Sequence, residues 1–272
     1  MPLMSSAIEN QIFVQFINLD RSEDRRDKIT NRLRKAGFDP IRCSGVDGSC
    51  LSEDNLRHYN EKRSYKYFGR KLYLGEIGCF LSHLRALEIF VESNKDYGLV
   101  VEDDLVVPKN FKKFCIDAIK AACQRKKDWQ IINLYKGCEK PFTELDKIEL
   151  NAHSHSFGIA HSFPTSAVAL LWTKKGAIEF LDKHKQIYAP FDHITKAHFS
   201  SNGKGLGFRN AVLANDAKFS VIKQVETIPS RKQRNILENL RYDFCMGKRD
   251  LHRNFCAYRS YFFNKLSKKP QN

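Results

Sequence analysis

Residues 97–104 read Tyr-Gly-Leu-Val-Val-Glu-Asp-Asp, an apolar run that leads directly into three adjacent carboxylates. The apolar run predicts a strand that is buried on both faces of a sheet. The carboxylates Glu102, Asp103 and Asp104 would then lie at the C-terminal end of that strand. Because ligands of open α/β sheets bind at this edge, the segment predicts both the fold class and the position of a functional site.

Strand-like and helix-like segments alternate on either side of this stretch. Residues 12–19 are β-branched and aromatic and predict a first buried strand. Residues 20–36 predict a helix with Ser22 as its N-cap and Gly37 at its end. We expect further strands at 40–43, 129–134 and 167–172, helices at 76–92, 111–122 and 176–184, a loop with a short helix at 45–70, and a loop at 151–166. The alternation predicts an α/β protein with a mostly parallel sheet flanked by helices.

The composition limits the class of protein. The chain has 272 residues, a formal net charge of +15, 42% hydrophobic residues and 28% charged residues, which excludes a disordered or fibrous protein. The length suits one large domain or one domain with an appendage. No apolar run approaches the roughly 20 residues that cross a bilayer, and residues 1–10 lack the features of a signal peptide. We therefore expect a cytosolic protein, with its cysteines reduced.

The last fifty residues differ in composition from the rest of the chain. Residues 223–272 contain twelve Lys or Arg and four Asp or Glu, with Phe, Tyr and Leu between the cations. Mixed basic and aromatic helices of this kind favour anionic membrane surfaces. The alternative is a helical tail that packs on the protein and exposes a solvated basic face.

The three carboxylates need a counter-charge. Carboxylates this close repel one another, and burying them without a cation is costly. Since alternate residues of an extended segment share a face, we expect Glu102 and Asp104 to point the same way. Oxygen ligands suit Mg²⁺ or Mn²⁺, so the segment predicts a divalent metal site. The alternative is an exposed acidic turn or the N-cap of the next helix.

A second segment, 74–84, reads Leu-Gly-Glu-Ile-Gly-Cys-Phe-Leu-Ser-His-Leu and begins the most regular predicted helix. Gly75 and Gly78 permit close backbone approach, and free amides at a helix start favour an anion. Glu76 and His83 are seven residues apart, which places them on the same side of a helix, two turns distant. The alternative is that Gly75 serves a turn and His83 satisfies a local hydrogen bond.

A third segment, 17–26, reads Ile-Asn-Leu-Asp-Arg-Ser-Glu-Asp-Arg-Arg and places Arg25 and Arg26 on a helix after a strand, as in a nucleotide contact region. In order and spacing the three segments resemble glycosyltransferase family 25. That family comprises bacterial lipooligosaccharide galactosyltransferases and relatives of the collagen galactosyltransferases. The resemblance extends over residues 11–230, and the segment 74–84 is its most specific part.

The resemblance implies a GT-A fold whose acidic Asp-x-Asp equivalent is Glu102-x-Asp104. There Mn²⁺ or Mg²⁺ would bind the diphosphate of a UDP-sugar, commonly UDP-galactose. It also implies inversion of configuration, which takes one in-line displacement and one general base. Asp192 is our first candidate for the base, with a helix N-cap as the alternative role, and His83 and Glu76 are further candidates. The residues expected at the donor are Asn18 and Asp20 near uracil or ribose, Arg25 or Arg26 near phosphate unless both are solvated helix residues, and Gly75, Gly78, Asp103 and Gln224.

The resemblance further implies a lipooligosaccharide or lipopolysaccharide type of acceptor. The expected partners are a UDP-sugar, an oligosaccharide or lipid-linked glycan, and the anionic surface of the bacterial inner membrane on its cytoplasmic side, with no nucleic acid. Residues 1–230 would form the GT-A-like domain and 231–272 a basic, aromatic-rich helical extension. Two alternatives remain open: a metal-dependent protein that binds or processes nucleic acid, suggested by the net charge, and a non-catalytic sugar-binding relative.

Overall fold

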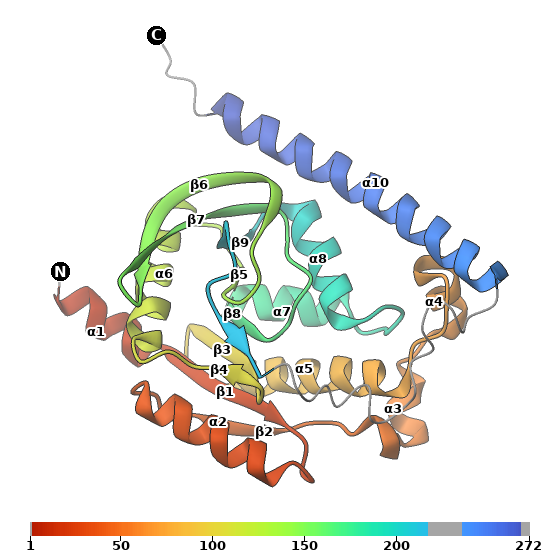
Figure 1. Ribbon diagram of the computed structural model, residues 1–272, viewed down its shortest axis with the longest axis horizontal. Coiled ribbons are helices and arrows are strands. Elements are labelled where there is room, and N and C mark those ends of the chain that lie inside the picture. Colours follow the sequence, from red (N-terminus) through yellow and green to blue (C-terminus); the bar gives the residue numbers. More distant parts are fainter. Residues whose placement is uncertain (1, 217–235, 268–272) are drawn as a thin grey trace.

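The computed structural model describes residues 2–216 and 236–267. Within them eight strands form one sheet in the order β2-β1-β3-β8-β5-β9-β7-β6 (Figure 1). These strands are β1 (Ile12–Asn18), β2 (Ile41–Ser44), β3 (Tyr97–Glu102), β5 (Ile131–Asn133), β6 (Glu139–Leu150), β7 (His153–Ser162), β8 (Ala169–Thr173) and β9 (Gly205–Phe208). A separate pair joins β4 (Leu105–Val106) to β10 (Ala214–Asn215).

Helices cover both faces of the sheet (Figure 1). They are α1 (Pro2–Asn10), α2 (Glu23–Lys35), α3 (Glu53–Arg57), α4 (Glu61–Phe68), α5 (Leu74–Glu92), α6 (Phe111–Arg125), α7 (Lys174–Lys183), α8 (Phe191–Asn202) and α10 (Ile236–Ser267), with a 3₁₀ turn η1 (Gly48–Cys50). None of the helices in the described ranges has the length and hydrophobicity needed to cross a bilayer.

The direction of the strands places a functional edge at the end of β3. β1 pairs in parallel with both β2 and β3, so the C-terminal residues Asn18, Ser44 and Glu102 lie at one edge. β8 runs antiparallel between β3 and β5, and β7 is antiparallel to both of its neighbours. The other six strands share one direction. The predicted mostly parallel α/β sheet is therefore confirmed and is consistent with a GT-A-like fold.

Alternation along the central strands divides the core into two layers. Leu99 and Val101 of β3 pack in the cluster formed with α1, α2 and α6, whereas Val100 faces the cluster formed with α5, α7 and α8. On β8, Leu171 and Leu170 divide between the same two clusters. A sheet buried on both faces explains why these strands are apolar throughout their length.

The predicted loop at 151–166 is wrong, because most of it belongs to the long β6–β7 hairpin. The polar composition of this segment concealed a strand whose side chains find partners distant in sequence. The buried His161 side chain lies 2.9 Å from the Thr143 hydroxyl and 2.9 Å from the Ser260 hydroxyl. Hydrogen-bond partners this far away in the chain cannot be recognised from the residues around His161.

The other segments follow the sequence closely. The structure confirms four predicted strands: 12–19 as β1, 40–43 as β2, 129–134 as β5 and 167–172 as β8. It also confirms four predicted helices: 20–36 as α2, 76–92 as α5, 111–122 as α6 and 176–184 as α7. Ser22 precedes α2, although its side chain makes no capping bond. Gly37 follows the helix with a φ of 88°. The described part of the tail is helical over Ile236–Ser267, and the expected boundary at residue 230 lies outside the described residues.

Close backbone approach at Gly78 attaches the 46–48 loop to α5. A Cβ on Gly78 would lie 2.6 Å from the Val46 carbonyl oxygen and 2.9 Å from the Gly48 nitrogen. A Cβ on Gly48 would in turn lie 2.6 Å from the Leu74 carbonyl. Gly78 on the helix and Gly48 on the loop therefore permit a close backbone approach, and the approaching backbone is the chain's own loop.

We predict that Gly78→Ala lowers the free energy of unfolding by about 1–3 kcal/mol, because the added methyl group overpacks a backbone contact. The measurement is denaturant unfolding. Gly247→Ala is the matched control: Gly247 lies in α10, where an added Cβ would meet no atom of the described residues within 4 Å, so this change should raise stability by about 0.5–1 kcal/mol. Equal effects of the two substitutions would contradict the packing role of Gly78.

Candidate active site

The three carboxylates after β3 separate into two groups. Asp103 turns toward β1 and α2: the Asn18 side-chain amide donates to it at 2.7 Å, and the Arg25 guanidinium pairs with its other oxygen. Burial raises the pKa of Asp103, and the Asn18 hydrogen bond and the Arg25 charge oppose that rise. Asp103 therefore joins the ends of the first and third strands.

Asp104 lies after the end of β3, in the turn that Asp103 and Asp104 form before β4, so the expectation that it shares a face with Glu102 by alternation stays a prediction. Burial, and after it the Glu102 charge, raises the pKa of Asp104 to about 6. The Asn215 amide donates to Asp104 Oδ2 at 3.1 Å, but the buried Oδ1 has no hydrogen-bond partner within the described residues. An unpaired buried carboxylate oxygen beside a second carboxylate is a position that a cation would stabilise.

Helix α5 brings a histidine and a thiol to Glu102. The buried His83 Nε2 lies 3.3 Å from Glu102 Oε1, and its ring stacks on Phe191 at a centroid distance of 4.3 Å. Ligand atoms of Cys79, His83 and Glu102 all lie within 4.8 Å of one another. Burial, followed by the Glu102 charge, raises the pKa of the Cys79 thiol well above its usual value. We did not predict Cys79 as a site residue, although its spacing of four from His83 on a helix was a usable signal.

Asp192 approaches this cluster from another element. It lies in the first turn of α8, beside the Phe191 ring that stacks on His83. Burial raises the pKa of Asp192 to about 6, with contributions from the Glu102 and Glu76 charges, while the His193 backbone N–H opposes the rise. A carboxylate that gains or loses its proton near neutral pH is suited to general base catalysis.

Glu76 has a structural task at the start of α5. Its two oxygens accept hydrogen bonds from Arg70 at 2.7 and 2.8 Å, and one also accepts from the Tyr73 backbone N–H at 2.9 Å. With both oxygens engaged, Glu76 is less suited than Asp192 to accept a proton from a substrate.

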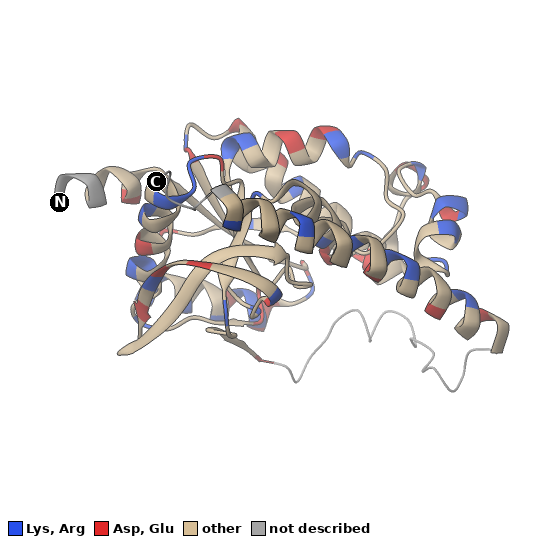
Figure 2. Cartoon of the chain, turned by 90° about the horizontal axis from the view of Figure 1, so that it is seen from above, with Lys and Arg blue, Asp and Glu red and all other residues tan. Residues whose placement is uncertain are grey.

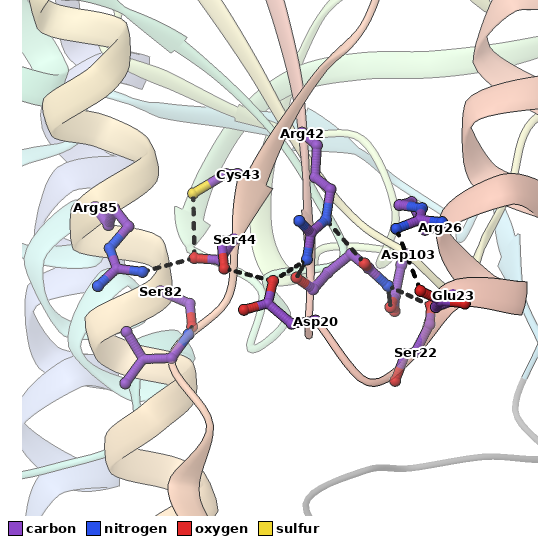
Figure 3. Close-up of polar contacts among 12 residues, drawn as sticks. Asp20, Ser22, Glu23, Arg26, Arg42, Cys43, Ser44, Ser82, Arg85 and Asp103 are labelled. Carbon is purple, nitrogen blue, oxygen red and sulfur yellow. Dashed lines mark hydrogen bonds and ion pairs between the residues drawn. The ribbon is translucent and has the colours of Figure 1, made fainter. Parts of the chain in front are cut away.

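Asp20, one of the predicted donor residues, lies beside Arg42 and Ser44 of β2 (Figure 3). Asp20 pairs with Arg42 and accepts from the Ser44 hydroxyl at 2.8 Å, and these two hydrogen bonds lower the pKa of Asp20. Arg42 Nε also donates to Asn18 Oδ1 at 3.1 Å. The side chain of Asp20 is 77% exposed, so it remains open to a ligand, whereas Asn18 is buried and holds its neighbours in place.

The remaining predicted residues are placed as follows. Arg25, not Arg26, reaches the carboxylate cluster, because Arg26 pairs with Asp27 on the surface of α2. Gly75 and Gly78 are buried against the 46–48 loop, and a part for them in donor binding stays a prediction. Gln224 lies outside the described residues.

Residues 10–195 match the family profile described as glycosyltransferase family 25 (LPS biosynthesis protein). The chain belongs to glycosyltransferase family 25. The matched range contains the cluster of Glu102, Asp104, His83 and Asp192, together with the rim at Asp20.

Animal proteins are among the relatives of this family 25 chain. It is 36% identical over 123 residues to a glycosyltransferase 25 family member of Aedes aegypti, and 33% identical over 127 residues to procollagen galactosyltransferase 2 of Homo sapiens. It is 34% identical over 125 residues to procollagen galactosyltransferase 1-B of Xenopus laevis. These matches cover 44–45% of the chain and 20% of each relative.

We predict that Asp192→Asn stabilises the protein at pH 8 and that the gain disappears near pH 4. The folded pKa of Asp192, about 6, lies above the usual value of 3.8. The contribution of this carboxyl to the free energy of unfolding is therefore fully present below pH 3.8. It is lost as the pH rises through about 6. An asparagine carries no charge to bury at high pH.

The measurement is the thermal midpoint of both proteins between pH 4 and pH 8. Asp182→Asn, which changes an aspartate that is 71% exposed on α7, serves as the control and should show no such pH trend. A constant difference between Asp192→Asn and the parent protein across this range would contradict the assignment of a buried, charged Asp192.

Proposed function

We propose that this protein transfers galactose from UDP-galactose to a hydroxyl group of a lipid-linked oligosaccharide, with a divalent cation and with inversion of configuration. The observation that carries the proposal is the convergence of Glu102 and Asp104 with Asp192 and His83 at one edge of the sheet. The names of the relatives, which include procollagen galactosyltransferases, support galactose as the transferred sugar.

The donor set at this edge fits a hard divalent cation. Glu102 and Asp104 supply carboxylate oxygens, and the buried Asp104 Oδ1 has no partner within the described residues, so these two residues would hold Mn²⁺ or Mg²⁺. When bound, the cation supplies Lewis-acid stabilisation of the charge that develops on UDP. Cys79 and His83 would add softer ligands to Glu102, a set that suits zinc better than magnesium.

Two residues of the chain position the nucleotide. Asp20 presents an exposed carboxylate beside the ends of β1 and β2, where the ribose or uracil of the donor would donate a hydrogen bond to it. Arg25 lies at the carboxylate cluster through its ion pair with Asp103, so it places a positive charge near the expected diphosphate.

Asp192 acts as the general base. The acceptor oxygen forms a bond to the anomeric carbon while the bond from that carbon to the UDP oxygen breaks, and UDP leaves with the electron pair. The acceptor hydroxyl proton passes to the Asp192 carboxylate. Because attack and departure occur in line in a single step, the product has inverted configuration. His83 stacks on Phe191 at the start of the same helix and limits the movement of that turn.

A lipid-linked, lipopolysaccharide-type acceptor at the inner face of a bacterial membrane is supported by the description of the matching family, LPS biosynthesis protein. The net charge of +15 suits an anionic acceptor. Transfer to a truncated lipooligosaccharide, compared with transfer to a collagen peptide, decides between this acceptor and the type named by the animal relatives.

We predict that Asp104→Asn weakens manganese-dependent UDP binding by more than about tenfold and abolishes transfer, because the substitution removes a charged ligand. Calorimetry with UDP, with and without Mn²⁺, measures the effect. Asp128→Asn is the control, since Asp128 is 61% exposed and pairs with Lys126 away from the cluster. Unchanged manganese-dependent binding in Asp104→Asn would exclude the metal assignment.

We predict that Asp192→Asn lowers kcat by about 10²–10⁴-fold, with UDP affinity close to that of the parent protein. The measurement is release of UDP from UDP-galactose in the presence of acceptor. Retained UDP binding with no transfer in the parent protein itself would instead support a non-catalytic sugar-binding relative. A steep loss of affinity for an oligonucleotide with salt, without UDP binding, would support a nucleic-acid-binding protein.

A further inference from the structure

The solvent side of α10 carries a continuous apolar stripe. Its large side chains are between 48% and 78% exposed and comprise Leu237, Leu240, Phe244, Leu251, Phe255, Tyr258, Phe262 and Leu266. At 1.5 Å per residue the stripe is about 44 Å long. An apolar surface of this extent marks a site of contact with another apolar surface.

The opposite face of α10 attaches the helix to the protein. The helix crosses α4, α8 and the β6–β7 hairpin (Figure 1). The Tyr242 ring packs on Phe68 at 5.6 Å, Ala257 is fully buried, and the Ser260 hydroxyl lies 2.9 Å from the His161 ring. The exposed stripe therefore does not hold α10 on the protein.

The spacing of the stripe is that of a straight helix. Three pairs of stripe residues recur 18 residues apart: Leu237 and Phe255, Leu240 and Tyr258, and Phe244 and Phe262. Eighteen residues make five turns at 3.6 residues per turn. A coiled-coil seam that began at Leu237 and Leu240 would need apolar residues at Gly247 and Asn254. The pattern therefore favours contact with a flat surface over contact with a second copy of the helix.

Cations lie along one edge of the stripe. Arg241, Lys248 and Arg259 are exposed, and each follows a stripe residue (Leu237, Phe244 and Phe255) by four positions. Residues four apart are neighbours on a helix surface. Figure 2 shows Lys and Arg distributed along the length of α10. An apolar stripe with cations at its edge is typical of helices that lie in the interface of an anionic bilayer.

A groove of about 870 Å³ opens beside this basic edge, between α10, α4 and α8. Six basic side chains line it, and no Asp or Glu of the described residues does: Arg63, Lys66, Lys248, Arg249, His252 and Arg253. Phe244 and Tyr67 add apolar surface to its wall. The groove thus combines a strongly positive lining with space for an apolar group.

Arg249 is a buried cation in the wall of the groove. It is 7% exposed; its Nη2 donates to the Met246 sulfur, and its Nε and Nη1 atoms have no hydrogen-bond partner within the described residues. Its guanidinium lies 4.9 Å from the Tyr67 ring centroid and 4.8 Å from that of Phe68. The neighbouring Arg253 pairs with Asp250. Buried charges in proteins are normally paired with an opposite charge, and no ion pair of Arg249 is formed within the described residues, so its position indicates an anionic ligand.

We propose that α10 docks the enzyme on an anionic membrane, with the apolar stripe in the bilayer interface and the phosphate of a lipid headgroup in the Arg249 groove. Phe244 and Lys248 connect the two parts, since Lys248 lies on the edge of the stripe and both residues line the groove. The proposal is independent of the sugar donor and of the general base.

This docking surface lies close to the candidate active site. Phe68, on which Arg249 packs, also contacts the His193 ring at 5.0 Å. His193 follows Asp192 in the first turn of α8. An enzyme held by α10 would therefore keep its general base near the membrane surface, where a lipid-linked acceptor is located.

Sedimentation with vesicles tests the proposal on the full chain. We expect binding to phosphatidylcholine vesicles that contain phosphatidylglycerol, and binding weaker by more than about tenfold to phosphatidylcholine alone. The double variant Phe255→Ser and Phe262→Ser should lose more than about tenfold in affinity for the anionic vesicles. The matched control is the double variant Leu56→Ser and Ile178→Ser, which changes exposed apolar residues on α3 and α7 and should bind like the parent chain.

Arg249→Met tests the groove. It removes an unpaired buried charge, so the variant should keep its thermal midpoint and lose the preference for anionic over neutral vesicles. Lys248→Gln, at an exposed position, should reduce the same preference without affecting the fold. Release of UDP with a soluble acceptor should be unchanged in all of these variants.

Three results would overturn the proposal. The first is equal binding of the parent chain to neutral and anionic vesicles. The second is a concentration-dependent dimer that the Phe255→Ser and Phe262→Ser variant loses, which would assign the stripe to a second copy. The third is thermal stabilisation by inorganic phosphate, lost in Arg249→Met, without any vesicle binding, which would assign the groove to a soluble phosphate compound.

Discussion

Repulsion among carboxylates at the end of β3 is the constraint on which the site depends. The fold neutralises part of this charge: Arg25 pairs with Asp103, and Arg70 pairs with Glu76. Burial, and after it the charge of Glu102, raises the pKa values of Asp104 and of Asp192 to about 6. Clusters of like charges that lower stability occur mainly at functional sites. A cation bound at Glu102 and Asp104 would relieve the repulsion.

The fold brings these groups together from four elements that are far apart in sequence. Parallel pairing of β1 with β3 aligns Asn18 with the carboxylates, and Gly48 and Gly78 let the 46–48 loop pack on the helix that carries Cys79 and His83. The first turn of α8 then adds Asp192 beside Phe191, whose ring stacks on His83. The helix α10 adds an exposed apolar and basic surface, and its Arg249 packs on Phe68, whose ring contacts His193 in the same turn of α8.

Much of this arrangement could be predicted from the sequence, because the decisive signals are local. The apolar run before Glu102 specified a buried strand that ends at Glu102, whereas the turn at Asp103 and Asp104 sets the directions of those two side chains and has no such local signal. The segment 74–84 specified a helix with a close backbone contact. What the sequence concealed depends on distant partners: the strand β7, whose His161 is satisfied by Thr143 and Ser260, and the antiparallel position of β8. Likewise, Cys79 and Arg249 gain importance only from neighbours that the fold supplies.

Anomalous X-ray scattering from crystals grown with Mn²⁺ and UDP would locate the cation. We expect one strong manganese peak in contact with a carboxylate oxygen of Glu102 and one of Asp104, with the diphosphate on its other side. A peak bound instead by Cys79 and His83, or a nucleotide bound in crystals that show no manganese at either carboxylate, would contradict the metal assignment.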